Sequence, residues 1–68
     1  MQSGKVKSWD SQRGFGFIVT EDDEELFVNV NDIHPSVQPK RLQEGQNVKF
    51  DVKSDMKGDR AVNVRIQR

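Results

Sequence analysis

Two phenylalanines separated by one glycine stand in the segment Arg13-Gly14-Phe15-Gly16-Phe17-Ile18-Val19-Thr20. Alternate residues of a β-strand point to opposite faces, so Phe15 and Phe17 share one face, opposite Ile18. A glycine between the two rings allows a backbone or a flat ring to approach closely, and it allows the sharp coiling that a small barrel needs. The segment therefore predicts a strongly curved strand with two neighbouring rings on one face.

Short runs rich in valine, isoleucine and phenylalanine continue on both sides of this segment, separated by clusters of glycine, proline, aspartate and asparagine. This pattern is typical of strands joined by short turns, and no long segment has a helical period. Between residues 31 and 45, Pro35 and Pro39 exclude a regular helix or a central strand, which leaves a loop with one helical turn near residues 31–33. The strands are expected at residues 4–10, 14–20, 25–30, 46–53 and 60–67.

Five strands without a long helix are too few for two well-packed sheets, and closing them into a barrel removes the exposed sheet edges. The predicted fold class is therefore all-β, a small five-stranded antiparallel barrel of the OB-fold type, with residues 1–68 forming one domain. A tight turn is expected at residues 10–13, where the side chains of Asp10 and Ser11 can bond to neighbouring backbone amides. A second hairpin is expected around residues 54–59, where Gly58 can adopt a positive φ angle.

The third expected strand has one aliphatic face and one face with an aromatic ring. Leu26, Val28 and Val30 share the first face, and Phe27 and Asn29 share the second. Because the aliphatic face can fill the core, Phe27 is predicted to point outward, where a large ring without a use is disfavoured. The same alternation predicts a core made of Val6, Ile18, Leu26, Val28, Ile33, Val48, Phe50, Val52, Val62, Val64 and Ile66.

Two lysines and the only tryptophan share one face of the first expected strand. Lys5, Lys7 and Trp9 have the same parity, so basic and aromatic side chains interleave there. In an alternative interpretation Trp9, near a strand end, caps the barrel. A further alternative places Phe15 and Phe17 in the core, because aromatic pairs two residues apart in a strand are often buried. Both alternatives stay open at this point, although the outward position of Phe27 favours an exposed aromatic face.

The charged residues are balanced in total but unevenly distributed. The chain has 11 Lys and Arg against 11 Asp and Glu, and five of the acids lie in residues 21–25, which leaves eleven bases and six acids elsewhere. A neutral chain can therefore carry a basic face beside an acidic turn. We interpret the acidic run as a solvated turn that discourages aggregation. Adjacent acids on a turn lack the fixed geometry of a magnesium site for hydrolysis, so no enzymatic activity is expected.

The sequence also bounds the ligands and the cellular compartment. Without cysteine there is no disulfide and no thiolate metal site, and the single histidine, His34, lacks clustered partners, so neither a metal nor another cofactor is expected. No apolar run approaches the roughly 20 residues needed to cross a bilayer, and no apolar signal region follows the amino terminus. We expect a cytoplasmic protein without a membrane partner.

Five segments resemble the bacterial cold shock domain, in order and near the usual spacing along nearly its full length. They are Gly4-Lys5-Val6-Lys7, Arg13-Gly14-Phe15-Gly16-Phe17-Ile18, Leu26-Phe27-Val28-Asn29-Val30, Leu42-Gln43-Glu44-Gly45-Gln46 and Val62-Asn63-Val64. The second and third segments are similar to the two ribonucleoprotein motifs of that family. On these segments the chain is identified as a divergent member of the cold shock protein family.

The resemblance implies a barrel that binds single-stranded RNA and DNA through aromatic rings on its second and third strands. It implies a monomeric RNA chaperone that acts in transcription or translation, often under cold stress. It marks Phe15, Phe17 and Phe27 as stacking residues, and Lys5, Lys7 and Arg13 as backbone or base contacts. Lys57 occupies a region where the family often has a basic contact, and Trp9 and Asn29 complete the predicted nucleic-acid-binding residues. Lys40 and Arg41 are further candidates for phosphate contacts, with a solvated loop as the alternative.

The sequence departs from the family pattern at several positions that usually carry a stacking side chain. Ser8 occupies the usual tryptophan position, and Asn29 and Val30 replace a histidine and a phenylalanine. Residues 34–39 lack the exposed aromatic that the family often has there. Trp9 partly compensates for these losses, and weaker binding is expected. The alternative is an OB-type protein-interaction module with weakened or lost nucleic-acid binding.

Overall fold

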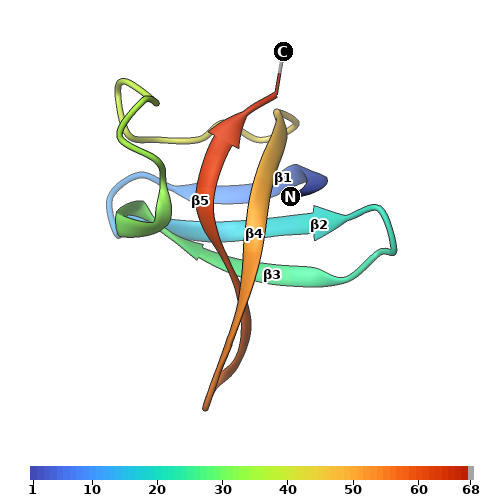
Figure 1. The fold of residues 1–68 in the computed structure, drawn as a ribbon. Coiled ribbons are helices and arrows are strands. Elements are labelled where there is room, and N and C mark those ends of the chain that lie inside the picture. Colours follow the sequence, from blue (N-terminus) through green and yellow to red (C-terminus); the bar gives the residue numbers. More distant parts are fainter. Residues whose placement is uncertain (68) are drawn as a thin grey trace.

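The strands close into a barrel in the order β1-β2-β3-β5-β4 (Figure 1). The structure, a computed structural model, describes residues 1–67. Within them, no helix is long and apolar enough to span a membrane. The all-β barrel predicted from the sequence is confirmed. Its elements are β1 (Gln2–Asp10), β2 (Phe15–Thr20), β3 (Glu25–Asn29), the 3₁₀ turn η1 (Val30–Asp32), β4 (Asn47–Asp55) and β5 (Gly58–Ile66).

One of the strand contacts that close the barrel is parallel. Neighbouring strands run antiparallel in the β1-β2, β2-β3, β1-β4 and β4-β5 ladders, whereas β3 and β5 run parallel where Phe27 pairs with Arg60. A closed ring with an odd number of strands cannot alternate direction at every step, so one parallel contact is unavoidable. The prediction of an antiparallel barrel therefore holds for every ladder except this closing one.

The interior is filled by aliphatic side chains around one phenylalanine, Phe50. Eight of these residues were predicted from strand alternation, whereas Leu42 and Ala61 were not. Leu42 lies in the loop before β4, where no strand periodicity signals burial. The buried apolar residues are Val6, Ile18, Leu26, Val28, Ile33, Leu42, Val48, Phe50, Ala61 and Val64.

A bulge in β5 shifts the alternation of its side chains. Lys49 pairs with Arg65, but the next ladder pair joins Asp51 to Val62, so β5 uses one more residue than β4. Within this stretch Asn63 has a φ of 53°, in the left-handed region. The predicted core position of Val62 is therefore wrong. Val62 is only half-buried, and Ala61 beside it faces the interior.

Two further core predictions fail at the margins of the barrel. β4 pairs with β1 only as far as Phe50, and beyond it β4 and β5 continue as a two-stranded arm, residues 52–60 (Figure 1). Val52 lies on this arm and is 36% exposed, because β1 does not extend far enough to cover it. Ile66, near the end of β5, is half-buried and packs against the core from outside.

Candidate nucleic-acid interface

Three phenylalanine rings form one cluster on the outer face of β2 and β3. The ring centroid of Phe27 lies 5.6 Å from that of Phe15 and 5.9 Å from that of Phe17, with interplanar angles of 30° and 75°. These separations are typical of aromatic pairs in contact. Phe17 is 37% exposed, and Phe15 and Phe27 are half-buried. The ring cluster, Phe15, Phe17 and Phe27, therefore presents a continuous apolar surface to solvent.

The opposite face of β2 points into the barrel, as the alternation predicted. Ile18 is fully buried, so the alternative that placed Phe15 and Phe17 in the core is wrong. A methyl group added at Gly16 would collide with the carbonyl oxygen of Ser8 and with the indole of Trp9. The close approach predicted at this glycine is therefore confirmed. The ring that lies against Gly16 is the indole of Trp9 on β1.

Trp9 lies on the inner side of the sheet because β1 contains a bulge. Val6 pairs with Ile18, but the next pairs join Ser8 to Phe17 and Trp9 to Gly16, so the alternation shifts at Lys7. Trp9 is half-buried and packs against the core, and its indole Nε1 is buried without a hydrogen-bond partner among the described residues. The prediction that Trp9 shares a face with Lys5 and Lys7 is wrong, and the indole takes the barrel-capping position.

Asn29 stands at the edge of the ring cluster, directly opposite Phe15 in the β2-β3 ladder. Its side-chain oxygen accepts a hydrogen bond from the backbone N–H of Asn31 at 3.0 Å. The carboxylate of Asp32 accepts one from the backbone N–H of Asn29 at 3.4 Å, which completes a capping box at the start of η1. The structure thus gives Asn29 a local structural role, and a nucleic-acid contact from it stays a prediction.

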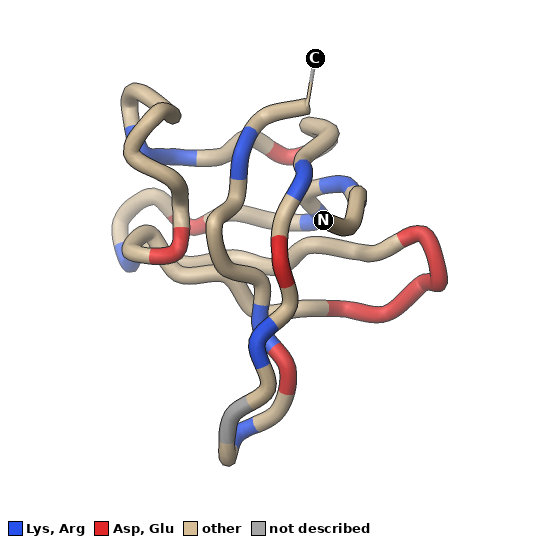
Figure 2. The backbone as a smooth tube through the Cα atoms, in the orientation of Figure 1, with Lys and Arg blue, Asp and Glu red and all other residues tan. Residues whose placement is uncertain are grey.

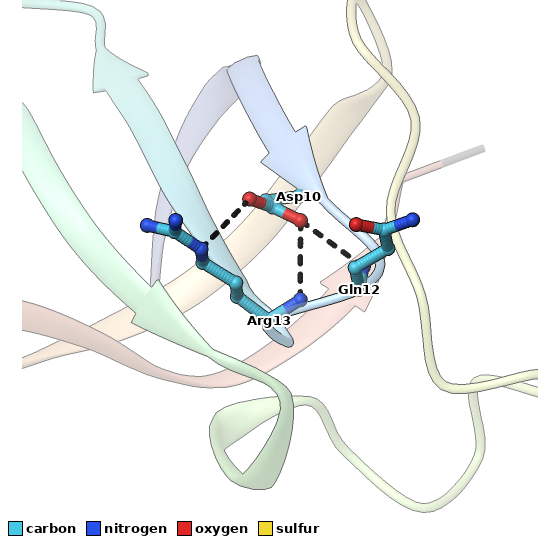
Figure 3. A network of polar contacts seen from close by, with 3 residues as sticks. All are labelled: Asp10, Gln12 and Arg13. Atoms are coloured by element: carbon cyan, nitrogen blue, oxygen red, sulfur yellow. Dashed lines mark hydrogen bonds and ion pairs between the residues drawn. The ribbon is translucent and has the colours of Figure 1, made fainter.

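The turn between β1 and β2 is held by one carboxylate (Figure 3). Asp10 Oδ1 accepts hydrogen bonds from the backbone N–H groups of Gln12 at 3.0 Å and Arg13 at 3.1 Å, while Oδ2 lies 3.8 Å from Arg13 Nε. The predicted side-chain bonding of Asp10 is confirmed. The turn presents the exposed Arg13 side chain two residues before Phe15, the first residue of β2.

The lysines predicted to bind on β1 are exposed but lie in different surroundings. Lys7 Nζ is 2.7 Å from Glu25 Oε1, so this ammonium is paired across to the start of β3. Lys5 is exposed opposite Val19. An exposed ion pair contributes about 0.2–1 kcal/mol, so a phosphate can compete with Glu25 for Lys7. Lys40 and Arg41 are exposed in the long loop before β4, and a contact from them stays a prediction.

A pocket of about 410 Å³ separates the ring cluster from the arm. Phe27 lines one side, and residues 57–60, which include the predicted Lys57, line the other. Arg60 also lines this pocket and pairs with Phe27 in the parallel β3-β5 ladder. Sequence reasoning missed Arg60, because a contact between strands separated by the whole of β4 leaves no signal in the local pattern.

The charged residues are unevenly distributed along the chain (Figure 2). The acidic run, residues 21–25, forms the turn between β2 and β3, at the opposite end of β3 from η1. Along β4 and β5, lysines and arginines alternate with acidic residues such as Asp51 and Asp59. Among residues 1–67 there is no group of three or more His, Cys, Asp or Glu side chains that could hold a metal ion.

Comparison with known proteins agrees with this architecture. A family model described as the 'Cold-shock' DNA-binding domain matches residues 2–67. The chain is 42% identical over 64 residues to the major cold shock protein of Streptococcus pyogenes serotype M6, covering 94% of each chain. It is 47% identical over 64 residues to a cold shock-like protein of Aquifex aeolicus, covering 93% of this chain and 90% of the relative. It is 44% identical over 62 residues to the cold shock-like protein CspB of Bacillus cereus, covering 91% of this chain and 94% of the relative. With five predicted motifs, a closed barrel and this similarity over nearly all of its length, the chain belongs to the cold shock domain family.

Proposed function

We propose that this protein binds single-stranded RNA and DNA by stacking unpaired bases on Phe15, Phe17 and Phe27. The observation that carries the proposal is the ring cluster, in which Phe27 contacts both Phe15 and Phe17 on the outer face of a rigid sheet. Every base has a π face, so such rings hold bases without reading their identity, and a duplex hides those faces within its own stack. This chemistry favours single strands with low sequence specificity.

The expected affinity follows from the number of rings. Each base stack contributes about 1–3 kcal/mol, so three rings supply about 3–9 kcal/mol before the costs of association are subtracted. This range corresponds to dissociation constants from millimolar to high nanomolar. Ser8 stands opposite Phe17 on the outer face, where an aromatic side chain would add a further stack. With serine at this position, we expect a lower affinity for single strands than an aromatic side chain there would give.

The basic side chains around the ring cluster are proposed to hold the sugar-phosphate backbone. Lys5, Lys7, Arg13 and Lys57 are exposed and would each add a salt-dependent contribution. Asn29 is proposed as a polar contact at the edge of the cluster. Contacts of this kind stabilise transiently open strands and disfavour hairpins without hydrolysing a nucleotide. We propose on this basis that the protein acts as an RNA chaperone in transcription or translation, as a monomer in the cytoplasm.

The test is a titration with a short pyrimidine-rich DNA single strand. An RNA strand of the same sequence, which forms no hairpin, and a duplex of the same length are titrated beside it. Because Trp9 packs against the core, the fluorescence anisotropy of an end-labelled oligonucleotide reports binding more directly than tryptophan emission does. We expect both single strands to bind, with an affinity that falls as salt increases, and the duplex to bind more weakly. Tighter binding of the duplex would contradict base stacking. A failure of every strand to bind would favour the protein-interaction module.

A further inference from the structure

An ion pair between Lys7 and Glu25 lies beside the ring cluster on the outer face of the sheet. Lys7 belongs to β1 and Glu25 begins β3, so the pair spans the intervening strand β2. The bulge in β1 allows this, because the consecutive residues Lys7 and Ser8 are both exposed. Glu25 lies two residues before Phe27 on the same strand, so the two side chains project from the same face. The ion pair therefore stands at the edge of the proposed binding surface.

The two charged groups of this pair are in direct contact. Lys7 Nζ donates a hydrogen bond to Glu25 Oε1 at 2.7 Å, and the two side chains are 54% and 52% exposed. The distance is much shorter than the 3.8 Å between Arg13 Nε and Asp10 Oδ2. An ion pair as exposed as this one adds little to the stability of a fold. Glu25 therefore affects the charge that Lys7 presents more than it affects the stability of the barrel.

A phosphate that approaches Lys7 meets the carboxylate of Glu25. An ammonium group has three N–H donors, so Lys7 can bind a phosphate while it still donates to Glu25, but the two anions then lie side by side and repel each other. If Lys7 instead turns toward the phosphate, the ion pair is lost and the carboxylate is left without its partner. In both arrangements the phosphate gains less from Lys7 than it would gain from an unpaired lysine.

On the function proposed above, we propose that Glu25 competes with the nucleic-acid backbone for Lys7 and thereby limits the affinity of the protein for single strands. Phosphate contacts supply the salt-dependent part of binding, whereas the rings bind the faces of unpaired bases. By weakening one phosphate contact, Glu25 lowers the affinity and its salt dependence and leaves the stacking surface intact. Binding then depends more on unpaired bases, which suits a chaperone that releases each strand again.

The acidic run offers a matched control for this competition. Glu24 directly precedes Glu25, is exposed, and makes no side-chain ion pair among residues 1–67. The variants Glu24→Gln and Glu25→Gln therefore remove the same charge one residue apart. A long-range effect of net charge acts on both, because neighbouring residues are closer than the screening length of about 10 Å at 0.1 M salt. Loss of competition acts on Glu25→Gln alone.

The experiment measures binding of a labelled pyrimidine-rich single strand at several salt concentrations. For Glu25→Gln we expect up to about fivefold tighter binding at 0.1 M salt and a slope of log affinity against log salt that is steeper by up to about 0.7, the contribution of one phosphate. Glu24→Gln should stay close to the wild type in both quantities. In a Lys7→Gln background, Glu25→Gln should bring no more gain than Glu24→Gln does. Thermal unfolding should show that all variants fold, since each substitution is on the surface.

The outcomes separate this inference from the proposed function. Equal gains in Glu24→Gln and Glu25→Gln, or a gain from Glu25→Gln that persists without Lys7, would assign the effect to general charge repulsion and overturn the competition. Unchanged or weaker binding by Glu25→Gln would also overturn it, while binding by the wild-type protein still supports base stacking. If neither the wild type nor Glu25→Gln binds any single strand, both proposals are overturned. A gain that is confined to Glu25→Gln and requires Lys7 supports the competition.

Discussion

The outer faces of this barrel differ between β2-β3 and β4-β5, although both enclose the same core. On β2-β3 the outward positions hold three phenylalanines, with Phe27 in contact with the other two rings. On β4-β5 they hold charged and polar side chains such as the opposed Lys49 and Arg65. The second face demonstrates that the barrel closes without exposed rings. The rings on the first face are therefore available for the base stacking proposed above.

The largest effect is expected from a phenylalanine on the inner side. Phe50 is fully buried, so Phe50→Ala leaves a cavity and should lower the free energy of unfolding by about 3–5 kcal/mol. Phe17→Ala removes the same ring from the outer face, where 37% of the residue is exposed, and should cost much less. Urea unfolding of both variants checks this difference. Similar losses in the free energy of unfolding would mean that Phe17 contributes to the core as much as Phe50 does.

The next effect is on binding. Phe27 contacts both other rings, so Phe27→Ala should weaken oligonucleotide affinity by about 1–3 kcal/mol with only a small change in unfolding. Phe27→Leu is the matched control, because it retains apolar bulk and removes the aromatic face. Anisotropy titration should find both variants weakened. Wild-type affinity in Phe27→Leu would show that apolar contact, and not stacking, holds the strand.

A gain of affinity is expected from adding a ring. Ser8 is exposed and directly opposite Phe17, so Ser8→Trp extends the ring cluster onto β1 and should strengthen binding by about 1 kcal/mol or more. Lys49→Trp places the same indole on the β4-β5 face and should not strengthen binding. The comparison of the two titrations decides whether position matters. Equal gains would indicate nonspecific contact with any added ring.

The smallest effect concerns the turn that precedes the ring cluster. Asp10 accepts two backbone hydrogen bonds, so Asp10→Ala should lower the free energy of unfolding by about 0.5–2 kcal/mol, like the loss of a helix cap. Asp10→Asn keeps an acceptor and should retain most of the stability. Chemical unfolding compares the three proteins. A full loss in Asp10→Asn would assign the effect to the ion pair with Arg13 instead of the hydrogen bonds.

Strand alternation was a sufficient guide wherever two strands pair without a bulge. It placed Leu26 and Val28 inside and Phe27 outside, and it identified Gly16 as the position of a close approach. It failed for Trp9 and Val62, because one extra residue in β1 and one in β5 reverse the alternation from one side of the bulge to the other. A bulge depends on how two strands pair, and local sequence does not report it.

The five segments of cold shock type, the alternating strands and the three outward rings could all be read from the order of the amino acids, because they depend on neighbours along the chain. The inward turn of Trp9, the burial of Leu42 and the position of Arg60 beside Phe27 arise only when the barrel closes. Closure joins residues that are distant in the sequence, and the register of each ladder then decides which face every side chain occupies.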